Sequence, residues 1–235
     1  MVTLQSESKP MVGILGGLGP LAGAWFYKRL VELTPATVDS EHLNIVLRSD
    51  PAIPSRINHI MGTGRSPAPA LIRIARELVD AGATLLVIPS STSHAYYDEV
   101  QQAVEQPIVN LPVEVASYVA RHRLRRIGLL VTDATIHAGV YDRVASEVFL
   151  PVVGNEVVRA RLQDVIASVK TGGDMAEARA TLGELVHDPC WGGCDALLLG
   201  CSELVVLGLE SSELVLVSVD DVLALAVLDA VTKAS

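Results

Sequence analysis

Residues 11–33 read MVGILGGLGPLAGAWFYKRLVEL. The apolar run MVGIL predicts a buried strand, GGLGP predicts a turn, and the remainder of the stretch predicts a helix. The same alternation of short apolar runs with longer helical segments continues to the end of the chain. Strands that read as continuous apolar runs between helices are typical of parallel sheets covered on both faces. The chain is therefore predicted to have an α/β fold.

The remaining elements follow the same two patterns. Residues 69–80 carry apolar side chains at helical spacing, whereas the prolines and glycines of residues 50–67 predict a loop. We expect further strands at 43–49, 84–89, 107–111, 127–132, 196–200 and 214–218. We expect further helices at 93–104, 113–122, 136–148, 155–171, 174–187 and 221–231.

Two parts of the sequence repeat weakly. GILG at 13–16 matches GLLV at 128–131. The run TLLVIPSSTSH likewise matches ALLLGCSEL, which puts Ser90 and Cys201 in equivalent places. We therefore expect two similar α/β lobes, with ligands bound in a shared cleft beyond the carboxyl ends of the strands. The first lobe is expected to comprise residues 1–113 and 211–235, and the second residues 114–210.

The composition excludes several classes of partner. A net charge of −9 over 235 residues argues against a nucleic acid, which needs a basic face, and 4% aromatic residues leave little for base stacking. No apolar run reaches the roughly 18 residues of a membrane span, and the N-terminal stretch lacks a signal-peptide pattern. Three cysteines, an odd number, do not suggest a secreted disulfide scaffold. We expect a cytoplasmic protein that binds neither nucleic acids nor membranes.

Three strand ends carry residues that can do chemistry, and each also has a plainer interpretation. Gly16–Pro20 can form an anion cradle from backbone N–H groups, but a tight turn is favoured on these residues alone. Ser90–His94 can donate hydrogen bonds to a carboxylate or cap the following helix. Cys201 begins a helix, which favours a thiolate, although buried cysteines are more often inert.

The sequence predicts neither a metal nor an organic cofactor. Cys190 and Cys194 form C-x-x-x-C without a second pair, which is a poor zinc motif. A pyridoxal phosphate enzyme needs a lysine with suitable partners, and the surroundings of the four lysines do not suggest one. Cofactor-free chemistry is therefore favoured.

Several ordered blocks of sequence are more specific than these motifs. They include GILGGLGP (13–20), DPAIPSR (50–56), PSSTSH (89–94), GLLVTDATI (128–136), VKTG (169–172), LLLGCSEL (197–204) and VD (219–220). Through them the chain resembles the cofactor-independent aspartate/glutamate racemase family from residue 11 to residue 231. The resemblance implies two lobes related by a pseudo-twofold axis, an active site in the cleft between them, no cofactor, and a homodimer.

The resemblance also implies a mechanism. In this family two cysteines face each other across the substrate α-carbon, one removing its proton and the other returning one. A thiol suits both roles because its pKa of about 8.5 can be lowered by its surroundings. Cys201 matches the cysteine that serves an L-substrate and becomes the main acid/base. At the position of the other cysteine stands Ser90, a far weaker acid, with His94 as the one candidate base beside it.

The serine leaves several interpretations open. The protein is a racemase of reduced or one-sided activity, a relative that needs one thiol, such as a decarboxylase or isomerase, or a chain in which the cysteine was replaced by engineering. Ser91 replaces the family's asparagine as well, so natural divergence is favoured over engineering. A catalytically weakened dicarboxylate-binding protein is a further alternative.

The substrate implied by the resemblance is a small dicarboxylic amino acid, aspartate or glutamate. Arg56 and Lys170 match the basic positions that hold its carboxylates, and an arginine can bind a carboxylate through two parallel hydrogen bonds. Further substrate contacts are expected from Ser91, Thr92, Thr132, Thr135, Ser202, Gly17 and Leu18.

Overall fold

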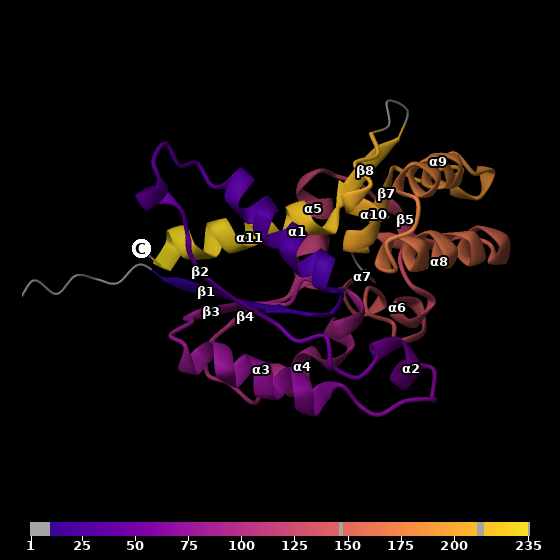
Figure 1. Ribbon diagram of the computed structural model, residues 1–235. Coiled ribbons are helices and arrows are strands. Elements are labelled where there is room, and N and C mark those ends of the chain that lie inside the picture. The colour runs from indigo at the N-terminus through magenta and orange to yellow at the C-terminus, as the bar shows by residue number, and fades with distance from the viewer. Residues whose placement is uncertain (1–9, 146–147, 211–213, 235) are drawn as a thin grey trace, which may run out of the picture.

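The computed structural model describes residues 10–145, 148–210 and 214–234, and its strands form two four-stranded parallel sheets (Figure 1). The strands are β1 (Met11–Gly16), β2 (Asn44–Ser49), β3 (Leu85–Val87), β4 (Ile108–Val109), β5 (Arg126–Leu130), β6 (Leu150–Val153), β7 (Ala196–Leu199) and β8 (Val215–Ser218). The first sheet has the order β2-β1-β3-β4, and the second has the order β6-β5-β7-β8. The two sheets therefore share one topology, and the predicted α/β fold is confirmed.

The helices lie between and around these strands. They are α1 (Pro20–Leu33), α2 (Arg56–Ile60), α3 (Ala68–Asp80), α4 (Tyr97–Gln101), α5 (Leu111–Arg121), α6 (Asp133–His137), α7 (Asp142–Ala145), α8 (Glu156–Lys170), α9 (Met175–Val186), α10 (Ser202–Val206) and α11 (Val219–Ala234). Short 3-10 helices occupy Asp39–Glu41, Thr92–Tyr96 and Pro189–Trp191. Within the described parts of the chain, no helix combines the length and the apolar character that crossing a bilayer requires.

Three local predictions differ from the structure. The helix expected at 136–148 is divided into α6 and α7, because the chain turns at Gly139 with a φ of 60°. The loop expected at 50–67 contains the short helix α2. The strand β6 is absent from the sequence prediction, because a proline interrupts its short apolar run and it is a partly exposed edge strand.

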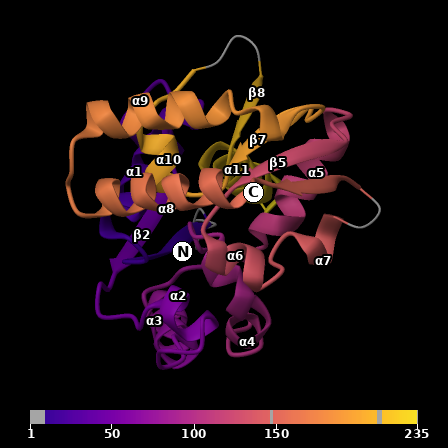
Figure 2. The ribbon, with the colours of Figure 1, turned by 90° about the vertical axis from the view of Figure 1, so that its right-hand side faces the viewer.

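Helices cover the outer face of each sheet. The first sheet packs on α3 and α4, and the second packs on α8 and α9. Figure 2 shows these two helix pairs on opposite sides of the molecule. Side chains alternate along β7, so that Leu197 and Leu199 face outward while Ala196 and Leu198 face the inner side.

One apolar cluster joins the inner faces of the two sheets. It includes Val87 of the first sheet, Leu198 of the second and Leu223 of α11, all fully buried. The C-terminal helix α11 also packs against both α1 and α5. The sheets therefore share a single interior, which α11 helps to close.

The C-terminal segment contacts elements of both lobes. Residues 211–235 are expected with the first lobe, yet β8 pairs with β7 in the second sheet, with Ala196 opposite Val215. The helix α11 that follows packs against α1, which belongs to the first lobe. The exact lobe boundaries stay a prediction.

Truncating the buried leucine of α11 should destabilise the whole protein. We expect Leu223→Ala to lower the free energy of unfolding by about 2–5 kcal/mol, because it leaves a cavity in the shared cluster. Leu225→Ala is the matched control, since Leu225 lies on the same helix and is 48% exposed. Urea unfolding measures both variants, and equal losses would contradict the role given to the cluster.

Candidate functional site

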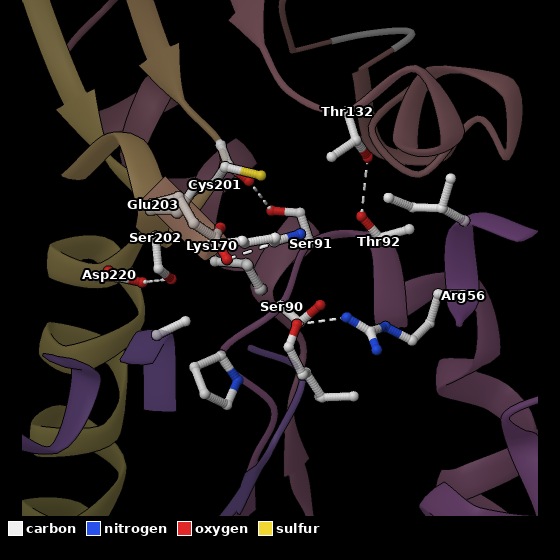
Figure 3. Close-up of a pocket in the computed structure, with 17 residues that line it drawn as sticks. Arg56, Ser90, Ser91, Thr92, Thr132, Lys170, Cys201, Ser202, Glu203 and Asp220 are labelled. Atoms are coloured by element: carbon white, nitrogen blue, oxygen red, sulfur yellow. Dashed lines mark hydrogen bonds and ion pairs between the residues drawn. The ribbon is translucent and has the colours of Figure 1, made fainter. Parts of the chain in front are cut away.

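A pocket lies where the carboxyl ends of both sheets converge (Figure 3). Its walls come from residues that directly follow the strands, together with the first residue of α2 and the last residue of α8. The polar and ionisable residues that line it are Arg56, Ser90, Ser91, Thr92, Thr132, Lys170, Cys201, Ser202, Glu203 and Asp220. The equivalent positions Ser90 and Cys201 thus line one pocket, as the repeat predicts.

Arg56 enters the pocket from the start of α2. Its guanidinium donates a hydrogen bond to the carbonyl of Leu18, which lines the pocket on the β1–α1 loop. Its Nε has no hydrogen-bond partner among the described residues, and burial lowers the pKa of the guanidinium. Gly17 does not line the pocket; it shapes this loop, because its φ is 89° and a Cβ there would lie 2.3 Å from the Asp50 carbonyl oxygen.

Lys170 lines the wall of the pocket opposite Arg56, where it pairs with a buried carboxylate. It is the last residue of α8, and its Nζ lies 3.7 Å from Oε1 of Glu203, which is 6% exposed. The sequence analysis does not assign Glu203 to the site. A ligand carboxylate that reaches Lys170 therefore meets a lysine already paired with a buried carboxylate.

Ser90 has a hydroxyl neighbour and no base. Its Oγ accepts a hydrogen bond from the Ser93 hydroxyl at 2.9 Å. His94 Nδ1 lies 2.9 Å from the Ser90 carbonyl oxygen, and His94 Nε2 accepts from the Leu111 backbone N–H at 3.1 Å. Burial lowers the pKa of His94, so the ring is neutral and both of its nitrogens are occupied. His94 is thus a structural residue and not the base for the Ser90 hydroxyl.

Ser91 connects the two halves of the pocket. Its hydroxyl donates to the Gly200 carbonyl at 2.7 Å and lies 2.9 Å from the Tyr141 hydroxyl. Gly200 immediately precedes Cys201, and a Cβ at Gly200 would lie 2.2 Å from a methyl group of Val131. The Ser91 hydrogen bond therefore holds the loop after β3 against the loop after β7.

Three threonines form a closed set of contacts. Thr92 Oγ1 lies 3.1 Å from Thr132 Oγ1 and 2.8 Å from Thr135 Oγ1, and the last two oxygens are 2.9 Å apart. Thr92 and Thr132 line the pocket. Thr135 is 1% exposed and stands behind them, so its expected contact with a ligand is indirect.

Cys201 immediately precedes α10, but its surroundings disfavour a thiolate. Burial and the Glu203 carboxylate raise the pKa of its thiol to about 12, and Lys170 only partly opposes this. The helix-start position favours a thiolate, but α10 has only five residues, and burial acts on the pKa in the opposite direction.

Asp220 is a second carboxylate that the sequence analysis does not assign to the site. It lies in the first turn of α11 and is 1% exposed. Its Oδ1 accepts a hydrogen bond from the Ser202 hydroxyl at 2.8 Å, whereas Oδ2 has no hydrogen-bond partner among the described residues. Burial, together with the neighbouring carboxylates of Asp221 and Glu203, raises the pKa of Asp220 to about 7.

The other cysteines lie outside this pocket. Cys190 and Cys194 are partly buried free thiols, and burial raises the pKa of both. Within residues 10–145, 148–210 and 214–234, no cluster of three or more His, Cys, Asp or Glu side chains is placed to hold a metal ion. The ionisable side chains to which we assign a chemical role therefore line the pocket, and Cys190 and Cys194 do not.

Comparisons with known proteins agree on one family. A family model described as Asp/Glu/Hydantoin racemase matches residues 15–231. The broad specificity amino-acid racemase RacX of Bacillus subtilis (strain 168) is 24% identical over 201 residues, covering 83% of this chain and 86% of that protein. Picrophilus torridus aspartate racemase has a solved structure with a TM-score of 0.82 and 27% identity, covering 95% of this chain and 94% of its own.

A more distant structure shares the fold. Glutamate racemase from Francisella tularensis subsp. tularensis SCHU S4, solved in complex with D-glutamate, has a TM-score of 0.64 and 19% identity. The match covers 96% of this chain and 82% of that one.

The buried carboxyl of Asp220 should make stability depend on pH. Its pKa is raised from 3.8 to about 7 in the folded state, so the unfolded chain loses this proton first. This carboxyl therefore costs stability progressively as the pH rises from about 4 to about 7. We expect Asp220→Asn to gain unfolding free energy relative to the parent, by on the order of 3 kcal/mol between pH 4 and pH 8.

Urea unfolding at several pH values measures this difference. Asp221→Asn is the matched control on the same helix, because the Asp221 carboxylate pairs with Arg29 at 2.5 Å outside the pocket. A difference between Asp220→Asn and the parent that stays constant from pH 4 to pH 8 would contradict the raised pKa.

Proposed function

The chain belongs to the Asp/Glu/hydantoin racemase family, and from that premise we propose that it racemises or epimerises a small acidic amino acid, aspartate or glutamate, without a cofactor. Cys201 is the main acid/base, and Ser90 faces it across the substrate. From the same resemblance we propose a cytoplasmic homodimer.

The observation that carries the proposal is the pairing of Ser90 and Cys201. The two residues follow β3 and β7, which hold the same place in their respective sheets, and both line the same pocket. Racemisation needs one group on each face of the α-carbon, and two equivalent strand ends that meet in a cleft supply them. The 27% identity with an aspartate racemase over most of both chains supports the acidic substrate.

Two cations are available for the substrate carboxylates. Arg56 presents an Nε without a protein partner in the described structure, and a planar guanidinium binds a carboxylate through parallel hydrogen bonds. Lys170 offers the second positive charge from the other wall of the pocket. Thr92, Thr132 and Ser202 add hydroxyl groups along the lining.

The proton chemistry begins at Cys201. Its thiolate takes the α-proton of the substrate, and the electron pair of the C–H bond stays on the α-carbon and delocalises into its carboxylate. Burial and Glu203 disfavour the thiolate, whereas the positive charges of Lys170 and of the bound substrate's ammonium favour it during the reaction. Abstraction therefore starts more readily from the L-substrate, whose proton faces Cys201.

The second proton arrives from the Ser90 side and completes the inversion. This step is slow, because an unassisted hydroxyl exchanges protons poorly near neutral pH and neither Ser93 nor His94 offers it a base. The same observation favours a second candidate function, a single-thiol relative such as a decarboxylase or isomerase that protonates one face only.

Removing either cation should weaken dicarboxylate binding. We expect Arg56→Ala and Lys170→Ala each to cost about 2–5 kcal/mol of binding free energy, because each leaves a ligand carboxylate without its partner in a desolvated pocket. Calorimetry with aspartate, glutamate and their analogues measures the loss. Arg65→Ala is the control, since Arg65 is an exposed arginine in the segment that follows α2. Unchanged affinities in both variants would remove these residues from the site.

The missing cysteine can be tested directly. In D2O, NMR follows exchange of the α-proton of L- and D-aspartate and of L- and D-glutamate. We expect Cys201→Ser to abolish exchange, because the principal acid/base is gone, and Ser90→Cys to raise two-way racemisation. Cys194→Ser is the matched control, because that thiol lies outside the pocket.

Each possible outcome of this experiment separates the candidates. Exchange of one enantiomer without inversion indicates the single-thiol enzyme, and binding without any exchange indicates a dicarboxylate-binding protein. Exchange that survives in Cys201→Ser rules out the proposed mechanism.

A further inference from the structure

The pocket is lined by a carboxylate with one oxygen that lacks a partner among the described residues. Asp220 is 1% exposed and lines the pocket, Ser202 holds its Oδ1, and its Oδ2 has no hydrogen-bond partner among the described residues. A buried acceptor without a partner is costly, and few native structures retain one without a reason. The free oxygen therefore points to a ligand group that donates hydrogen bonds.

Each nearby cation of the described chain already contacts another group. Arg29 holds both carboxylate oxygens of the neighbouring Asp221, at 2.5 and 3.1 Å. Lys170 pairs with Glu203, and Arg56 donates to the Leu18 carbonyl. None of the ion pairs within the described residues involves Asp220, so its carboxyl has no counter-charge in direct contact in this part of the chain.

We propose that the free oxygen of Asp220 binds the α-ammonium of the amino-acid substrate. This inference rests on the proposed function and adds the part of the pocket that recognises the amino group. An ammonium has three N–H donors and no acceptor, so it complements a carboxylate oxygen that lacks both a donor and a counter-charge.

The position of Asp220 suits this role. Ser202 is the residue after Cys201, and its hydroxyl donates a hydrogen bond to the Asp220 carboxyl. Asp220 and Cys201 lie on one side of the pocket and Arg56 lies on the other (Figure 3), so an ammonium bound to Asp220 would lie on the Cys201 side of the α-carbon. The ammonium and the carboxylates of one small substrate thus meet oppositely charged partners from different walls.

The charges of the lining favour a zwitterionic amino acid over a plain dicarboxylic acid. Arg56 and Lys170 supply two positive charges, and Glu203 and Asp220 supply two carboxylates. A dicarboxylic acid without an amino group brings only negative charge next to Asp220. The amino acid brings the one positive group that this carboxylate lacks.

The test compares each amino acid with the acid that lacks its amino group. Calorimetry gives the affinities of aspartate and succinate, glutamate and glutarate, and alanine and propionate for the parent and for Asp220→Asn. We expect the parent to prefer the amino acid, and Asp220→Asn to reduce that preference at least about tenfold, mainly by weakening amino-acid binding. Asp220→Ala, checked for folding by circular dichroism, should give the same change if the asparagine variant does not fold.

The matched control is Asp221→Asn, which alters the adjacent carboxylate outside the pocket and should leave the preference unchanged. The inference is overturned if the parent shows no preference for any amino acid, or if the Asp220 variants keep the parental preference. A preference that Asp220 controls only for alanine over propionate upholds the ammonium site and contradicts the acidic substrate of the proposed function.

Discussion

The two sheets bury their inner faces in one common apolar cluster, and this shared burial fixes how they face each other. Val87, Leu198 and Leu223 come from the first sheet, the second sheet and the C-terminal helix, and none of them is exposed. Since side chains alternate along a strand, burial of these residues sets which face of each strand points toward the other sheet. The ends of β3 and β7 consequently reach the same pocket, and the Ser91–Gly200 hydrogen bond holds their loops together there.

Much of this architecture could be predicted from local patterns. The strand–turn–helix of residues 11–33 and the repeat that relates Ser90 to Cys201 are sufficient to expect an α/β fold whose strand ends share a cleft. The amphipathic pattern at 69–80 predicts α3 within one residue. Local patterns report burial along one segment and not which strands pair. For this reason β6, a partly exposed edge strand, is missed, and the pairing of β8 with β7 is not anticipated.

The candidate site, too, could be predicted only in part from the sequence. Hydroxyl, thiol and cationic residues stand in recognisable blocks, and the structure brings Ser90, Cys201, Arg56 and Lys170 to one pocket. Glu203 and Asp220 stand in such blocks too, in LLLGCSEL and VD, but the sequence assigns them no role, because an acidic residue is presumed to face water until the tertiary structure buries it. For the thiol of Cys201, the sequence shows the helix start, whereas only the fold shows the burial that raises its pKa.

The three threonines have a consequence that follows from counting protons. Their three hydroxyl groups carry one proton each, and the three oxygens lie 2.8 to 3.1 Å from one another. If each hydroxyl donates to the next around the ring, every proton is used and only lone pairs face the pocket. A carboxylate can then gain a donor from Thr92 or Thr132 only when one O–H rotates and the ring opens. Such a rotation replaces one hydrogen bond within the ring by one to the ligand, so the number of hydrogen bonds is unchanged.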